Sequence, residues 1–146
     1  RSVRQDVPEG YYNLPLGKAC HLTQGNDLTV ITYGAPVHKA LEIIKKIDTH
    51  TFDLIDLRSL CPLDKDAIIN SVKRTGKTII LQEDSMFGGL ASEISSIIME
   101  NCFEYLDAPV IRVASLDTPI PFEKSLEDQY LPYDRFEVEL DKLLNY

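Results

Sequence analysis

The segment from Phe52 to Gly89 places two apolar runs on either side of a single helical stripe. The first run, Phe52 to Leu57, is short and carries four apolar residues, Phe52, Leu54, Ile55 and Leu57, which is typical of a strand covered on both faces. The second run, Thr78 to Leu81, is rich in β-branched residues and predicts another buried strand. A strand, a helix and a second strand in this order predict a right-handed crossover unit, and we expect its two strands to be neighbours in one sheet.

The helix between these strands has recognisable ends. Pro62 disfavours helix at the residue before it, and Asp64 is a candidate N-cap. Gly76 is expected to end the helix. The apolar stripe of this helix is formed by Ala67, Ile68, Ile69 and Val72.

The rest of the chain also alternates between strand and helix patterns. Lys18 to Thr23 predicts a short strand, and the turn signal at Gln24 to Asp27 suggests that it reverses into a strand at Leu28 to Tyr33. The other predicted elements are a helix from Pro36, a helix from Leu90 to Asn101, a strand from Val110 to Ala114 and a helix from Tyr133 to Leu144.

The pattern between Leu116 and Pro132 is different, because three prolines interrupt it and no regular spacing follows. It predicts a structured surface loop. Taken together, the elements predict an α/β fold: a three-layer αβα sandwich with a five-stranded, mostly parallel sheet whose first strand is antiparallel.

The length of 146 residues indicates one domain. We expect residues 1–13 to form an interdomain linker or arm and residues 14–146 to form the domain. The arm has no core face of its own, so the sequence is expected to be a piece of a longer protein. The net charge of −8 disfavours nucleic acid and anionic membranes as partners and favours a basic partner.

Cysteine and histidine spacing gives no metal or disulfide signal. The three cysteines, Cys20, Cys61 and Cys102, are far apart and contain no CxxC pair, so free thiols in a reducing compartment are expected. His21, His38 and His50 fall on separate predicted elements, which disfavours a metal site.

The common nucleotide and hydrolase motifs are also missing. Gly34-Ala35-Pro36 stands where a dinucleotide fold needs GxGxxG. Thr75-Gly76-Lys77-Thr78 lacks the upstream glycine of a phosphate loop and precedes a strand. Ser85 lies in DSMFGG and not in a GxSxG turn.

Two loops at the carboxyl ends of the crossover strands hold the candidate site residues. Gly88 and Gly89 begin a helix, where free amides could hold an anion, although a tight turn with close backbone packing is the favoured explanation. Arg58 and Glu83 follow strands that we expect to be neighbours, so they could form a charge-assisted hydrogen bond that orders both loops. A catalytic carboxylate is the alternative, but neither loop offers a histidine.

The order of several short motifs resembles one known family. These motifs are Gly17-Lys18-Ala19, the strand from Asp27 to Gly34, Asp56-Leu57-Arg58 with Pro62-Leu63-Asp64, Glu83 with Gly88-Gly89, Tyr105-Leu106-Asp107-Ala108-Pro109, and Pro119-Ile120-Pro121 with Leu126-Glu127 and Tyr130-Leu131-Pro132. Together they resemble the C-terminal domain of the β subunit of 2-oxo acid dehydrogenases of the pyruvate and branched-chain type, and the likeness covers nearly the whole chain. The linker sequence VPEGYYNLPLGKA resembles the branched-chain type and the bacterial forms with fused α and β parts more than it resembles the pyruvate type.

The resemblance implies a transketolase C-terminal-like sheet and a role in assembly. In that family thiamine diphosphate and Mg are bound by other domains, so the resemblance implies no catalytic or cofactor-binding residue here. It implies pairing with another β-type subunit, contact with an α-type subunit or domain, and docking of the subunit-binding domain of the dihydrolipoyl acyltransferase. By motif match, Asp107 is the implied acidic contact to that basic domain, assisted by the carboxylate of Tyr146. The implied location is the bacterial cytoplasm or the mitochondrial matrix.

A second class of function remains open from the residues. A free-standing αβα domain could bind a small molecule or an anion at the Gly88-Gly89 helix start. Such a domain would be complete in itself, whereas the assembly domain would be part of a longer reading frame.

Overall fold

The computed structural model describes residues 6–146, and the first five residues of the predicted arm lie outside the described part. The strands are β1 (Cys20–His21), β2 (Leu28–Thr32), β3 (Phe52–Asp56), β4 (Thr78–Ser85) and β5 (Ile111–Ser115). The helices are α1 (Pro36–Ile44), α2 (Lys65–Thr75), α3 (Leu90–Cys102), α4 (Lys124–Tyr130) and α5 (Tyr133–Leu144), with a 3₁₀ turn η1 (Phe103–Tyr105). Residues 6–16 are exposed and have no regular structure. None of the helices in residues 6–146 has the length and apolar character that a bilayer crossing requires.

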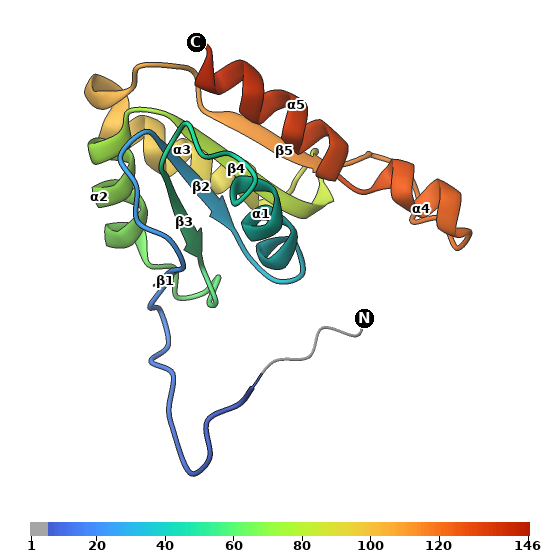
Figure 1. Cartoon of the computed structure of the whole chain (residues 1–146), viewed down its shortest axis with the longest axis horizontal. Helices are drawn as coiled ribbons and strands as arrows, with labels where there is room; N and C mark the ends of the chain where they lie inside the picture. The colour runs from blue at the N-terminus through green and yellow to red at the C-terminus, as the bar shows by residue number, and fades with distance from the viewer. Residues whose placement is uncertain (1–5) are drawn as a thin grey trace.

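The five strands form one sheet in the order β1-β3-β2-β4-β5 (Figure 1). β1 is antiparallel to β3, and the other pairs are parallel. The predicted fold class, with an antiparallel first strand, is therefore confirmed. The predicted hairpin between the first two strands is wrong, because β1 pairs with β3 and not with β2. The Gln24–Asp27 turn instead carries the chain from one side of β3 to the other. Just before this turn, Leu22 N–H donates to Leu54 O of β3 at 2.8 Å.

The predicted adjacency of the two crossover strands is also wrong, since β2 lies between β3 and β4. The β3–α2–β4 connection therefore skips one strand position. Length and apolar pattern identify a parallel crossover, but they do not fix how many strands it passes.

Two apolar cores lie on opposite faces of the sheet. Strand side chains alternate between them, so Leu54 joins the core under α1 and α5 whereas Ile55 joins the core under α2 and α3. Phe136 and Leu140 of α5 are fully buried in the first core, and Ile94 and Ile98 of α3 in the second. This double cover explains why β2 is buried at every position.

The region predicted as an irregular loop contains α4, so that prediction is wrong. Glu123 caps this helix, because its Oε2 accepts the N–H groups of Ser125 at 2.9 Å and Leu126 at 3.2 Å. Only Tyr130 of α4 is buried, so the sequence has no apolar stripe to signal a helix. The helix projects from the side of the domain in Figure 1.

Candidate functional site

The parallel strands give the sheet two functional edges. We call the edge where they begin the amino edge, formed by residues 45–51, 76–77 and 106–110 together with 145–146 of the chain end. The edge where they end is the carboxyl edge, formed by residues 33–35, 57–64, 86–89 and 116–123. The candidate residues divide between these two edges.

At the carboxyl edge, Arg58 has an unusual backbone. Its φ angle is 56°, in the left-handed region that favours glycine. The turn is held by Asp56, whose Oδ1 accepts the Arg58 N–H at 3.1 Å, and by Ser59, whose Oγ accepts the Gly17 N–H at 3.2 Å. The β3–α2 loop is thus bonded to the segment that enters the domain.

The structure does not bring Arg58 and Glu83 together. Their strands are separated by β2, and among residues 6–146 no ion pair or hydrogen bond joins the two side chains. Glu83 lies instead near the start of α5: burial raises the pKa of the Tyr133 hydroxyl, and the charge of Glu83 raises it further. Any ordering role of Arg58 and Glu83 stays a prediction.

Gly88 and Gly89 are each favoured at their positions for a different structural reason. Gly88 has a φ of 74°, which suits glycine. A Cβ on Gly89 would collide with the amide of Gln82, a fully buried side chain. Gln82 Oε1 accepts the Ala91 N–H at 2.7 Å, and its Nε2 donates to Ser85 O at 2.6 Å. Because an internal amide already occupies the first turn of α3, close packing explains these glycines better than an anion site does.

At the amino edge, Asp107 is fixed against the end of α2. Its N–H donates to Gly76 O at 2.9 Å, and its carboxylate lies so close that a Cβ on Gly76 would collide with it. Gly76 takes a φ of 69° as the C-cap of α2. Nearby, the Lys73 ammonium sits 4.8 Å from the ring centroid of Tyr105. The YLDAP segment is therefore clamped onto α2 while the Asp107 residue stays exposed.

The chain end reaches the same edge. Lys77, which follows Gly76, donates from Nζ to Leu144 O at 3.4 Å. Tyr146 N–H lies 3.4 Å from Leu143 O, and the Tyr146 side chain is exposed. Gly76 and Lys77 thus connect Asp107 with the chain end, so the two predicted partner contacts share one edge. Figure 1 shows the C-terminus on this side of the sheet.

A buried polar network lies beneath the amino edge, and sequence reasoning missed it. Asp53 in β3 is fully buried and accepts hydrogen bonds from Ser71 Oγ at 2.5 Å and from the Arg74 guanidinium of α2. Its other oxygen lies 2.8 Å from His21 Nδ1 in β1. Thr29 in β2 shares a 2.7 Å hydrogen bond with Ser71. The network joins three strands to α2. The sequence feature that could have revealed it is the aspartate inside the apolar run FDLID.

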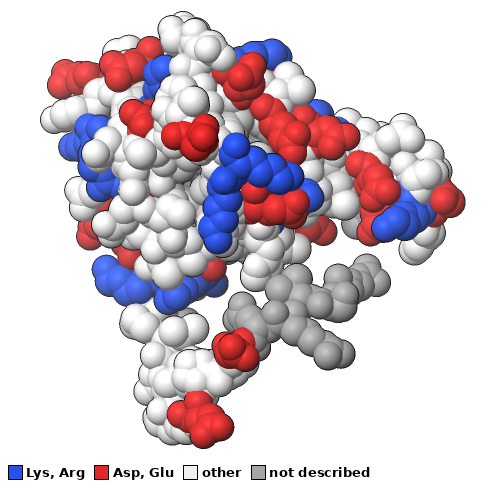
Figure 2. Space-filling view, in the orientation of Figure 1, with Lys and Arg blue, Asp and Glu red and all other residues white. Residues whose placement is uncertain are grey.

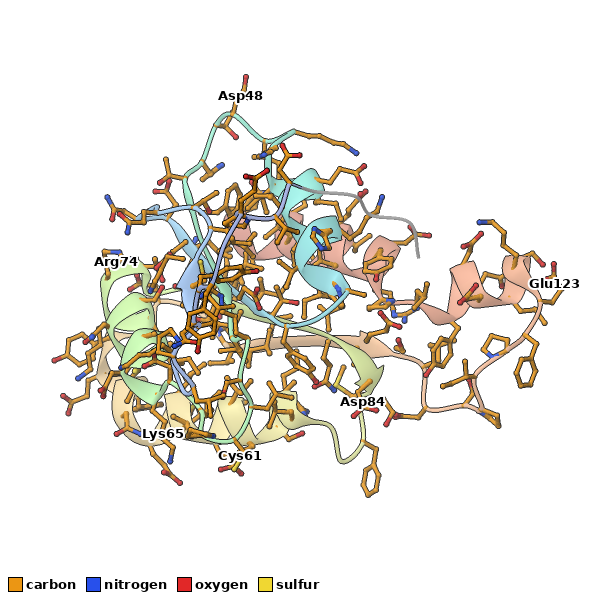
Figure 3. All side chains as sticks on the ribbon, turned by 90° about the horizontal axis from the view of Figure 1, so that it is seen from below. Asp48, Cys61, Lys65, Arg74, Asp84 and Glu123 are labelled. Atoms are coloured by element: carbon orange, nitrogen blue, oxygen red, sulfur yellow. The ribbon has the colours of Figure 1, made fainter. Side chains whose placement is uncertain are left out.

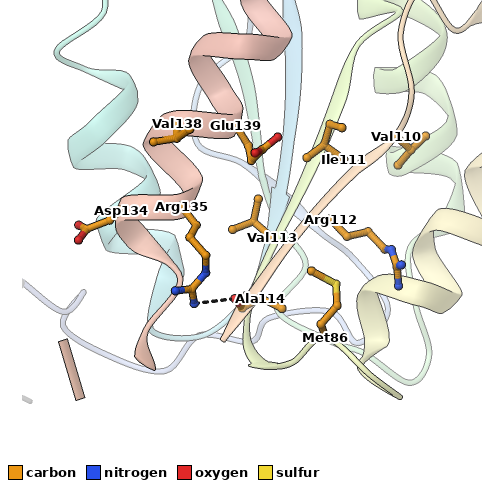
Figure 4. Close-up of a pocket in the computed structure, with 10 residues that line it drawn as sticks. All are labelled: Met86, Val110, Ile111, Arg112, Val113, Ala114, Asp134, Arg135, Val138 and Glu139. Atoms are coloured by element: carbon orange, nitrogen blue, oxygen red, sulfur yellow. Dashed lines mark hydrogen bonds between the residues drawn. The ribbon is translucent and has the colours of Figure 1, made fainter. Parts of the chain in front are cut away.

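A groove between α5 and the edge strand β5 was also missed. We call it the α5–β5 groove: a cavity of about 690 Å³ lined by Met86, Val110, Ile111, Arg112, Val113, Ala114, Asp134, Arg135, Val138 and Glu139 (Figure 4). Arg135 crosses one end of it and donates to Ala114 O at 2.9 Å. Sequence patterns did not reveal the groove because it depends on β5 being the last strand of the sheet.

Metal and thiol chemistry find no support in the part of the chain that is described. Residues 6–146 contain no group of three or more His, Cys, Asp or Glu side chains that could hold a metal ion. Cys20, Cys61 and Cys102 are free, and burial raises the pKa of the Cys102 thiol.

Comparison with known proteins now decides the family. The protein-family model described as "Transketolase, C-terminal domain" matches residues 17–135. The chain belongs to the transketolase C-terminal domain family. As a member of this family it is similar to a solved structure titled "Split gene transketolase, inactive beta4 tetramer", with a TM-score of 0.76 and 26% identity over 95% of this chain and 46% of that one.

Two curated relatives of this transketolase C-terminal domain come from Bacillus subtilis. The 2-oxoisovalerate dehydrogenase subunit beta is 38% identical over 100% of this chain and 46% of that protein. The pyruvate dehydrogenase E1 component subunit beta is 42% identical over 90% of this chain and 41% of that protein. The chain thus spans less than half the length of these relatives, and its similarity is to β subunits of 2-oxo acid dehydrogenases.

Proposed function

We propose that this transketolase C-terminal domain is the assembly domain of the β subunit of a thiamine-diphosphate-dependent 2-oxo acid dehydrogenase. The whole enzyme would decarboxylate a 2-oxo acid oxidatively and transfer the acyl group to lipoamide. The proposal is supported by similarity to β subunits along nearly the whole chain. It places the protein in the bacterial cytoplasm or, in a eukaryote, the mitochondrial matrix.

The cofactor does not fit the described residues. Thiamine diphosphate with Mg²⁺ needs oxygen ligands for the cation and free donors for the diphosphate. Residues 6–146 contain no acidic cluster able to hold a metal, and the first turn of α3 is capped by Gln82. We therefore assign the cofactor to other parts of the longer protein and derive no catalytic step from this chain. Isothermal titration of the chain with thiamine diphosphate should show no binding, and micromolar affinity would contradict the assignment.

The amino edge is the proposed docking surface for the basic subunit-binding domain of the dihydrolipoyl acyltransferase. The observation that carries this proposal is that Asp107 and the chain end lie on the same edge. Asp107 is bonded to Gly76, and the next residue, Lys77, is bonded to Leu144 near the chain end. Because the Asp107 N–H is bonded to Gly76 O, the backbone of Asp107 is already held in place, which lowers the entropy cost of presenting its carboxylate to a partner. An exposed acidic group of this kind complements a basic partner.

The carboxyl edge is proposed to contact the neighbouring domain of the longer chain. Phe87 is 88% exposed and Phe122 is fully exposed there, and the entering segment is bonded to the β3–α2 loop. Figure 3 views the domain from below, with Cys61 and Asp84 near the body and Glu123 farther out, at the start of α4. Large apolar side chains left exposed at one edge of a sheet are typical of surfaces that another domain covers.

Docking is tested by titrating the subunit-binding domain into the assembled dehydrogenase. Asp107→Ala should weaken the affinity by about tenfold, because one charged contact to a basic group is removed. Glu104→Ala is the matched control: Glu104 is also exposed and lies in η1, but it is not bonded to Gly76. Unchanged affinity for the Asp107 variant would contradict the docking proposal.

A further inference from the structure

A second cavity, of about 380 Å³, lies at the amino edge between the second half of α5 and the end of α1 with the loop after it. We call it the α1–α5 cavity. Its floor is apolar: Ile43 and Leu140 are buried, while Ile47 and Leu144 are half-buried and pack against the core under the two helices. A cavity of this size that combines an apolar floor with a few polar groups is typical of a small-molecule site.

Two acids form the α5 side of the cavity. Glu137 and Asp141 are four residues apart, so their side chains lie on the same face of the helix. Both residues are exposed, and no ion pair among residues 6–146 involves either of them. Like charges at this spacing repel each other. A cation held between the two carboxylates would relieve that repulsion.

A lysine and a histidine form the α1 side. The Lys46 side chain is 64% exposed, and its Nζ lies 3.4 Å from Glu42, which Lys39 also contacts at 3.1 Å. Lys46 can therefore turn to another anion while Glu42 keeps a partner. His50 is half-buried, and its Nδ1 lies 2.9 Å from Thr49 Oγ1. When that hydroxyl donates to Nδ1, Nε2 carries the ring proton and can donate to a ligand.

The two sides of the cavity carry opposite charges, with the apolar floor between them. Figure 2 shows basic side chains over α1 beside acidic side chains along α5. Packed helices have axes about 8–10 Å apart, so a ligand that reaches both sides needs its own charges separated by several bonds. A free α-amino acid carries both charges on one carbon, whereas a dipeptide carries them at opposite ends. A smaller cavity of about 180 Å³ shares Ile47 and His50 with the first and gives room for a second side chain.

We propose that the α1–α5 cavity binds a short zwitterionic peptide with apolar side chains, a dipeptide in the simplest case. The ammonium of the peptide lies between Glu137 and Asp141. Its carboxylate is bound by Lys46 and His50, and its side chains cover the apolar floor. Charge-assisted hydrogen bonds at both ends fix the direction of the peptide in the cavity. The inference goes beyond the proposed function and does not depend on it.

The test is a titration of the isotope-labelled chain with leucyl-leucine, followed by backbone NMR shifts. The peptide should give saturable shifts at the residues that line the cavity. Acetyl-leucyl-leucine lacks the ammonium and leucyl-leucinamide lacks the carboxylate, so each should bind about tenfold more weakly. Free leucine, which cannot reach both sides, should bind at least as weakly as these. A lack of saturable shifts, shifts outside the cavity, or any of these probes binding as tightly as leucyl-leucine would overturn the inference.

Variants on each side of the cavity separate the proposed contacts from a general effect of charge. Glu137→Gln should weaken leucyl-leucine about fivefold without weakening the acetylated peptide, because only a free ammonium meets Glu137. Lys46→Gln should weaken leucyl-leucine without weakening the amide, because only a free carboxylate meets Lys46.

Glu139→Gln is the matched control. It makes the same change of charge on the same helix, but Glu139 lines the α5–β5 groove and pairs with Lys142. It should leave the affinity for leucyl-leucine unchanged. A loss equal to that of Glu137→Gln would show a general effect of charge and would overturn the inference. The docking test at Asp107 is separate, so either proposal can fail while the other holds.

Discussion

The two edges of the sheet differ in how many of their polar groups have partners within the domain, and in the strained backbone and exposed phenylalanine found at one of them. At the amino edge, Asp53, Arg74, Gly76 and Lys77 all have internal partners, and the exposed Asp107 is held by its backbone. At the carboxyl edge, Arg58 has a strained backbone, and Phe122 has no cover. This difference supports the proposals that a separate partner docks at the amino edge and that a neighbouring domain covers the carboxyl edge.

The largest expected effect is at the buried network of the amino edge. Asp53→Ala removes the acceptor shared by Ser71 and Arg74 and should lower the free energy of unfolding by about 3 kcal/mol. Urea denaturation measures the loss. Asp48→Ala is the control, since Asp48 is an exposed loop residue (Figure 3), and should change stability by less than about 0.5 kcal/mol. Equal losses in the two variants would show that the network does not hold this edge.

A pair of glycine substitutions compares the edges directly. Gly76 and Gly88 both have positive φ, so alanine strains the backbone at either position. Only at Gly76 would the new Cβ also collide with Asp107, since the space around Gly88 is open. We expect a loss of about 2 kcal/mol for Gly76→Ala and about 1 kcal/mol for Gly88→Ala in thermal unfolding. Gly76→Ala should in addition weaken docking, and a Gly88 variant with the larger loss would reverse the comparison.

The strain at the carboxyl edge can be released without removing a contact inside the domain. Arg58→Gly should raise the free energy of unfolding of the chain by about 0.5 kcal/mol, because glycine tolerates a φ of 56° and the gain exceeds its extra entropy when unfolded. Arg58→Ala keeps the strain while removing the guanidinium and serves as the control. If both variants have the same stability in denaturant unfolding, the backbone of Arg58 is not strained.

The smallest effect is an acid dependence at the amino edge. Hydrogen bonds from the Thr51 side chain and backbone, both 2.6 Å, lower the pKa of Asp27 below its ordinary value of 3.8. Since the folded pKa is the lower one, the stabilisation is present above pH 3.8 and is lost as the pH falls through the folded value. Asp27 is exposed, so the effect is small. Asp27→Asn should flatten the fall in melting temperature below pH 4, and an unchanged slope would refute this role.

Local pattern predicted the elements that carry strong local signals. Asp64 caps α2 by accepting the Ala67 N–H at 3.3 Å, Gly76 ends that helix, and α5 runs from Tyr133 to Leu144 as its apolar stripe indicated. The errors arose where distant segments decide. Strand order is a property of the whole sheet, so neither the place of β2 nor the partner of β1 could be obtained from spacing.

The sequence predicted less of the candidate site. The motif containing Asp107 precedes β5 and so places this residue at the amino edge, but its contact with Gly76 depends on the end of α2. Its role in docking stays a prediction. Asp53 was overlooked because an aspartate within an apolar strand has no local partner. Its partners Ser71 and Arg74 come from a helix that begins nine residues after β3 ends.

Hydroxyl-radical footprinting of the proposed β subunit, alone and with the subunit-binding domain that we propose docks on it, tests the difference between the two edges most directly. The side chains to follow are Phe87 and Phe122 at the carboxyl edge and Tyr146 at the amino edge, all exposed in this domain. We predict that both phenylalanines are protected in the β subunit alone, and that Tyr146 becomes protected only when the binding domain is added. Phenylalanines that stay reactive in the longer protein, with Tyr146 unaffected by the partner, would contradict the account.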